Sequence, residues 1–141
     1  MKYDEKSCGI VVFREGKGKR YYLILKYPGG HFDFPKGHVE DKDADEQATA
    51  IRELHEETSI DDIKFIDGFR EKIAYKHIRN KKLSNKQVIF FLGETHKEKI
   101  TLSFEHPKYF WLTYKEAVKK ATYANAKNLL EKAEKTLNIK A

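Results

Sequence analysis

Three glutamates, Glu53, Glu56 and Glu57, are the residues whose spacing first suggests chemistry. At about 100° per residue they fall within one narrow arc of a helix. Like charges at this spacing destabilise an isolated helix by about 0.2–0.5 kcal/mol per pair unless a cation lies among them. Mg²⁺ is a suitable cation, because it prefers a few carboxylate oxygens and keeps several waters for contact with phosphate. The spacing fits a solvated, glutamate-rich helix face equally well.

The composition limits the kinds of protein that could position these glutamates. A length of 141 residues predicts a single domain over residues 1–141, and 40% hydrophobic residues supply a core. The one cysteine, Cys8, excludes an internal disulfide and any multi-cysteine zinc site, so we expect a reducing cytoplasm. No apolar run approaches the roughly 20 residues of a membrane-spanning helix, so no membrane partner is expected. The net charge of +6 is spread along the chain and slightly favours a phosphorylated small molecule over nucleic acid.

The order of strand-like and helix-like segments predicts an α/β fold in which helices flank a mixed β-sheet. β-Branched and aromatic runs predict strands at residues 7–13, 21–27, 63–69, 72–77 and 86–94, and we expect residues 28–37 to form an ordered loop. The glycine-rich segment 15–18 predicts a hairpin turn between the first two strands. Asp43 with Glu46 predicts a capping box for a helix over residues 44–57, and Thr113 with Glu116 predicts a second helix that packs residues as far as 133.

The segment from Gly37 to Ile60 resembles the Nudix box, the signature of hydrolases that act on nucleoside diphosphates linked to another group. The family pattern is Gly, five residues, Glu, seven residues, then Arg-Glu-aliphatic-any-Glu-Glu-any-Gly-aliphatic. Residues 52–57 match the central part of this pattern. The resemblance implies an α/β/α sandwich, and the specificity of the motif makes a chance match improbable.

Three departures from the Nudix pattern are present. Asp43 replaces the early Glu, the stretch before Arg52 is one residue longer, and Ser59 stands at the second Gly. The family's early Glu pairs with the Arg, so the resemblance implies that Asp43 or Asp45 pairs with Arg52. We expect Ser59 to adopt a left-handed backbone conformation, which costs a non-glycine residue on the order of 1 kcal/mol.

The resemblance extends over nearly the whole chain, and its closest form is the group of asymmetrical diadenosine tetraphosphate hydrolases. The segments that carry it are residues 7–9, 31–38, 68–69, 86–91 and 103–112. It implies metal ligation by the backbone carbonyl of Gly37, by the three glutamates of the box, and by Glu105 as a loop-borne ligand or base. The implied metal is Mg²⁺, with Mn²⁺ as a substitute. For the general base we favour Glu57, with Glu53 and Glu105 as alternatives.

Five further residues are expected to bind substrate. Lys36 and Lys86 suit phosphate contacts because an ammonium group follows phosphate oxygens as a point charge. His38 is expected to contact phosphate or to order its loop. Tyr75 and Tyr109 occupy positions that resemble an adenine clamp, and ordinary packing is the alternative for each of them.

The resemblance implies magnesium-dependent hydrolysis of dinucleoside polyphosphates, in which water attacks phosphorus and splits diadenosine tetraphosphate into ATP and AMP. One alternative keeps the mechanism and changes the substrate to another nucleoside diphosphate derivative, a capped RNA 5′ end or a diphosphoinositol polyphosphate. Another is a non-catalytic module that binds nucleotides or RNA. The glutamates argue against a pure binder, because without metal their charge would repel a polyanion. The sequence leaves the oligomeric state open.

Overall fold

The computed structural model of the chain describes residues 3–140, with side chains as far as residue 139. Its elements run in the order β1 (Glu5–Gly16), β2 (Lys19–Lys26), β3 (Phe32–Asp33), β4 (Lys36–His38), α1 (Glu46–Thr58), β5 (Lys64–Arg79), β6 (Lys82–Glu94), β7 (Lys108–Leu112), α2 (Tyr114–Lys120) and α3 (Ala124–Lys140). Among residues 3–140, no helix has the length and apolar character needed to cross a membrane.

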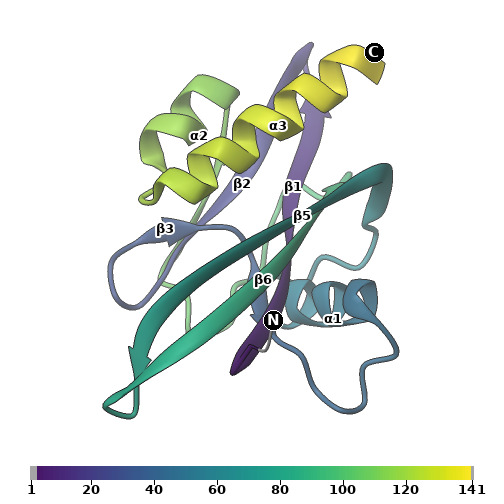
Figure 1. Cartoon of the computed structure of the whole chain (residues 1–141). Helices are drawn as coiled ribbons and strands as arrows, with labels where there is room; N and C mark the ends of the chain where they lie inside the picture. Colours follow the sequence, from purple (N-terminus) through teal and green to yellow (C-terminus); the bar gives the residue numbers. More distant parts are fainter. Residues whose placement is uncertain (1–2, 141) are drawn as a thin grey trace.

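The strands form one mixed sheet in the order β3-β2-β1-β6-β5, with β4 paired to β1 and β7 paired to β2. Only the β1–β6 pairing is parallel among the described strands. Alternate residues of β1 face opposite sides, so Val11 packs with Leu130 of α3, whereas Ile10 packs with Leu54 of α1. Figure 1 shows the same arrangement, with α2 and α3 on one face and α1 on the other. The expected α/β/α sandwich is confirmed.

Two hairpin turns determine how far the strands extend. Lys17 and Gly18 both have positive φ, at 52° and 76°, as a tight two-residue hairpin requires, and the predicted β1–β2 hairpin is confirmed. Asn80 and Lys81 also have positive φ and join β5 directly to β6. The prediction of two strands within residues 63–77 and of a strand starting at residue 86 was therefore wrong. A register shift between Phe65 and Arg70, which contains Gly68 at φ 85°, bends one continuous strand instead.

The caps of α1 differ in part from the sequence prediction. Asp45, and not Asp43, is the N-cap, since its side chain accepts a hydrogen bond of 2.8 Å from the backbone N–H of Ala48. Asp43 lies outside the helix and binds other groups of the site. Ser59 ends the helix with φ 66° and donates its backbone N–H to His55, so its expected left-handed conformation is confirmed.

The C-terminal region forms two helices where the sequence predicted one. The capping box of Thr113 and Glu116 is present and opens α2. The helix stops at Lys120 because Thr122 pairs with β3. The backbone N–H of Thr122 donates to the carbonyl of Phe32 at 3.1 Å, and the hydroxyl of Thr122 accepts from the N–H of Phe32 at 2.8 Å. This break places Tyr123 beside the sheet.

An ion-pair cluster ties α1 to the sheet on the face that carries α1. Glu46 binds Lys6 of β1 at 2.7 Å and Arg70 of β5 at 2.8 Å. The Arg70 guanidinium, and then Lys6, lower the pKa of Glu46 to about 2. A carboxylate whose pKa is lower in the folded than in the unfolded protein stabilises the fold at pH values above its unfolded pKa. This contribution is lost as the pH falls through the folded pKa.

We therefore expect Glu46→Gln to lower the melting temperature at pH 7, with a difference from the wild type that shrinks as the pH falls towards about 2. A difference independent of pH, measured by circular dichroism, would contradict this.

Candidate active site

A pocket of about 330 Å³ brings together most of the residues expected to carry the chemistry. We call it the carboxylate pocket, because Glu53 and Glu57 of α1 and Glu105 of the loop before β7 line it. It is also lined by predicted site residues of β4 and β6, namely Lys36, Gly37, His38 and Lys86. Segments distant in the sequence therefore meet at one cavity.

Glu57 is the most buried carboxylate of this pocket, with 6% of its surface exposed. The backbone N–H of Lys36 donates to Oε1 of Glu57 at 3.2 Å, and Nε2 of His106 lies 3.5 Å from Oε2. Burial raises the pKa of Glu57 although His106 opposes the shift. Burial alone would lower the pKa of His106, but the carboxylate raises it above its ordinary value. Glu57 is therefore held in one orientation and has the raised proton affinity of a base.

Gly37 and Glu53 approach each other so closely that no larger residue fits at position 37. A Cβ atom on Gly37 would lie 2.0 Å from the carboxyl carbon of Glu53. Burial raises the pKa of Glu53, and the like charges of Glu57 and Glu56 raise it further against the opposing effect of Arg52. Crowded carboxylate oxygens beside a backbone segment are the donors that a hard divalent cation prefers. The residues present therefore fit Mg²⁺ or Mn²⁺.

Arg52 connects the carboxylates of α1 to the loop before the helix. Its Nε and Nη2 donate to the two oxygens of Asp43 at 2.9 and 3.0 Å, so Asp43, and not Asp45, pairs with it. The guanidinium holds the pKa of Asp43 well below its usual range. Nη1 of Arg52 donates to Glu53 at 2.8 Å and to Glu56 at 2.7 Å.

Glu56 departs from the sequence prediction. The three glutamates were expected to converge, but Glu56 is exposed, turns to Arg52 and does not line the carboxylate pocket. Within residues 3–140, no group of three or more His, Cys, Asp or Glu side chains lies close enough to hold a metal ion in this conformation. Carboxylates repel one another, and the guanidinium of Arg52 supplies the positive charge that Glu56 contacts. Glu53 and Glu57 remain as the helix-borne pair in the pocket.

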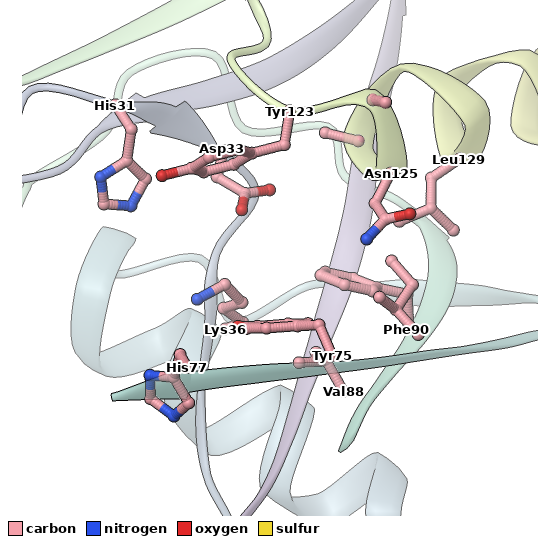
Figure 2. Close-up of a pocket in the computed structure, with 13 residues that line it drawn as sticks. His31, Asp33, Lys36, Tyr75, His77, Val88, Phe90, Tyr123, Asn125 and Leu129 are labelled. Atoms are coloured by element: carbon pink, nitrogen blue, oxygen red, sulfur yellow. The ribbon is translucent and has the colours of Figure 1, made fainter. Parts of the chain in front are cut away.

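A larger pocket of about 530 Å³ adjoins the carboxylate pocket. We call it the aromatic pocket, because Tyr75 of β5 and Tyr123 before α3 line it from opposite sides (Figure 2). Both tyrosines are exposed, at 39% and 52%, and Val88 and Phe90 add apolar surface. Lys36 lines both pockets, so the two cavities share one cationic residue. Apolar walls with a few polar groups are typical of a small-molecule site.

Tyr109 is not brought to either pocket. It lies on β7 opposite Leu25 and packs against the hydrophobic cluster on the α1 side of the sheet. The sequence expectation that Tyr75 and Tyr109 form a clamp therefore differs from the geometry, in which Tyr123 faces Tyr75. The sequence pattern misses Tyr123 because it predicts one helix for the residues after Thr113. The adjacent Thr122 and Tyr123, both poor helix formers, were the available signal for a break.

The two expected phosphate contacts lie close to each other. Lys86 is 8% exposed, and burial together with the charge of Lys36 lowers its pKa. The ammonium of Lys36 lies 5.2 Å from the ring centroid of Tyr27, which positions it over the aromatic face. Two cations that repel each other are stabilised by an anion between them, so this part of the site favours phosphate.

Comparisons with known proteins agree with this geometry. Residues 5–133 match the NUDIX domain family. The chain is 33% identical to the bis(5′-nucleosyl)-tetraphosphatase [asymmetrical] of Sus scrofa, over 94% of this chain and 95% of that protein. It is 34% identical to the enzyme of the same name from Caenorhabditis elegans, over 90% and 92% of the two chains. A crystal structure of a C. elegans Ap4A hydrolase binary complex superimposes with a TM-score of 0.85 at 32% identity, covering 95% of this chain and 98% of the other.

The chain therefore belongs to the Nudix family. Enzymes of this family generally use divalent metal ions such as Mg²⁺.

Proposed function

We propose that this protein is a single-domain cytoplasmic hydrolase that splits diadenosine tetraphosphate asymmetrically into ATP and AMP with Mg²⁺. The observation that carries the proposal is the junction of the two pockets at Lys36, which places a base-sized apolar cavity beside a carboxylate-lined one. The names of the relatives from Sus scrofa and C. elegans, whose full lengths the chain nearly covers, support the choice of substrate.

The aromatic pocket is proposed to hold one adenine between Tyr75 and Tyr123. Stacking on an aromatic ring contributes roughly 1–3 kcal/mol per base in nucleic-acid complexes. Lys36 and Lys86 then lie where the phosphates enter the carboxylate pocket, with His38 at its rim. The second nucleoside is proposed to extend outward, because carboxylates and lysines line much of the carboxylate pocket.

The carbonyl of Gly37 and the carboxylates of Glu53, Glu57 and Glu105 are proposed to hold Mg²⁺, joined by Glu56 when it leaves Arg52. When bound, Mg²⁺ supplies a water of lowered pKa and offsets charge on the phosphoryl oxygens. Asp43 fixes the guanidinium of Arg52 and so restrains Glu53 from the side away from the pocket.

Glu57 is proposed as the group that takes the proton of the attacking water. The oxygen of that water bonds to phosphorus, and the bridging P–O bond breaks to release ATP while AMP retains the new oxygen. The backbone N–H of Lys36 and the ring of His106 keep the Glu57 carboxylate directed into the pocket. Glu53 and Glu105 remain alternatives for this proton transfer.

Product analysis tests the proposed substrate. Purified protein with Mg²⁺ is offered diadenosine tetraphosphate, capped RNA, a sugar nucleotide and a diphosphoinositol polyphosphate, and the products are separated by chromatography. The proposal predicts ATP and AMP in equal amounts from the first, with the highest kcat/KM of the panel. Two ADP, or faster turnover of another compound, would refute it. Binding without turnover of any compound would leave the non-catalytic module.

A further inference from the structure

Glu5 is a buried carboxylate that the chemistry above does not use. Its side chain is 4% exposed, at the start of β1. Oε1 accepts hydrogen bonds from Arg79 at 2.9 Å and from His38 at 3.2 Å, and Oε2 accepts from His77 and Ser84. The Ser84 hydroxyl outweighs burial and, with the two histidines, lowers the pKa of Glu5 to about 2, so it is an anion at neutral pH.

Two of the four side chains that bind Glu5 line the pockets. His77 lines the aromatic pocket, whereas His38 lines the carboxylate pocket. Lys86, which also lines the carboxylate pocket, is the direct neighbour of Glu5 in the parallel β1–β6 pairing. One carboxylate therefore contacts side chains of both pockets and lies beside a lysine of the carboxylate pocket.

The Glu5 cluster also fixes the hairpin that carries part of this edge. His77 and Arg79 lie at the end of β5, and Ser84 lies on β6 opposite His77. A hairpin end without a covering helix has few buried contacts, so its side chains need a specific anchor. A buried charge with its acceptor positions filled supplies such an anchor, because any displacement leaves the charge unpaired.

We propose that Glu5 is a positioning residue that holds His38 and His77 along the path of the polyphosphate between the two pockets, and so determines how tightly the phosphate chain binds. This inference rests on the proposed function only in that the ligand is an adenine nucleotide with several phosphates. Glu5 itself does not contact the ligand. Its carboxylate acts through the donors that it orients.

Glu46 provides a matched control for the structural effect of losing such a carboxylate. It also joins β1 to β5, through Lys6 and Arg70, and its pKa is also lowered to about 2. Glu46 lies on the α1 side and lines neither pocket. Glu5→Gln and Glu46→Gln each remove one carboxylate charge that joins β1 to β5, although the Glu5 side chain is the more buried, at 4% exposed against 24% for Glu46. Only Glu5 binds side chains that line the pockets.

The test measures KM and kcat for diadenosine tetraphosphate, ATP binding by calorimetry without divalent metal, and melting temperature. We expect Glu5→Gln to raise KM and weaken ATP binding about tenfold, the effect of losing one charge-assisted hydrogen bond between a displaced histidine and the phosphates, and to change kcat less than about twofold. Both variants should lower the melting temperature, but Glu46→Gln should leave KM and ATP binding unchanged. Combining Glu5→Gln with His77→Ala should weaken ATP binding less than the two single effects multiplied, because residues in contact are coupled.

Three results would overturn the inference. These are equal ATP affinity in wild type and Glu5→Gln, a loss of ATP affinity in Glu46→Gln as large as that in Glu5→Gln, or a loss in the double variant equal to the product of the two single losses. These outcomes are separate from failure of the proposed function. A wild type that binds ATP but does not hydrolyse diadenosine tetraphosphate would refute the reaction, while the binding comparison would still decide the role of Glu5.

Discussion

Replacing Glu57 with glutamine is expected to lower kcat by about 100- to 10,000-fold while KM changes only a few-fold. The amide cannot accept the proton of the attacking water. The loss of this proton acceptor affects the transition state more than the bound substrate. The fold should tolerate the change. Glu57 is 6% exposed and burial raises its pKa, so the neutral amide removes a buried charge. We expect a melting temperature equal to or above that of the wild type.

A suitable control for Glu57→Gln is Glu131→Gln on α3, which removes an exposed carboxylate that is paired with Lys135 and lines neither pocket. It should leave kcat unchanged. Steady-state kinetics and a thermal melt of both variants make the comparison. A Glu57→Gln enzyme with kcat within threefold of wild type would rule out Glu57 as the base and transfer that role to Glu53 or Glu105.

Truncating Tyr123 to alanine is expected to raise KM for the nucleotide substrate by roughly 5- to 150-fold, which corresponds to the loss of about 1–3 kcal/mol of stacking. The side chain is 52% exposed, so the effect on folding should be small. Tyr75→Ala should act in the same way from the opposite wall. Tyr75→Phe and Tyr123→Phe should retain most of the affinity, because the stacking surface remains.

A substitution at Tyr109 distinguishes the clamp expected from the sequence, Tyr75 with Tyr109, from the clamp that the structure favours, Tyr75 with Tyr123. Tyr109→Ala removes packing against the hydrophobic cluster beside α1, so it should lower the melting temperature and leave KM near the wild-type value. If Tyr109→Ala raised KM and Tyr123→Ala did not, the adenine would stack elsewhere than in the aromatic pocket.

The parts of the fold that were predicted correctly depend on local chemistry. The turn at Lys17 and Gly18 follows from residues that tolerate positive φ between two strand-like runs. The left-handed Ser59 follows from its place just after the helix, where a glycine is usual. Periodicity likewise placed Glu53 and Glu57 on the inner side of α1, where both line the carboxylate pocket.

The parts that the sequence did not reveal depend on contacts between distant segments. Asp43 and Asp45 are both good N-caps, and Arg52 decides between them by drawing Asp43 away from the helix end. The break between α2 and α3 depends on Thr122 pairing with Phe32, ninety residues away in sequence. The pairing of Glu56 with Arg52 depends on the side-chain conformation of Glu56, which its spacing on the helix does not specify.

Uptake of divalent metal at Glu53 and Glu57 is the central claim, and calorimetry tests it most directly. Mg²⁺ is titrated into metal-free protein, alone and with a non-hydrolysable tetraphosphate analogue, for wild type, Glu53→Gln, Glu56→Gln and Glu131→Gln. The account predicts saturable uptake by wild type and Glu131→Gln, loss of uptake in Glu53→Gln, and weakened uptake in Glu56→Gln. Absence of Mg²⁺ and Mn²⁺ uptake by the wild type even with the analogue, or undiminished uptake by Glu53→Gln, would contradict it.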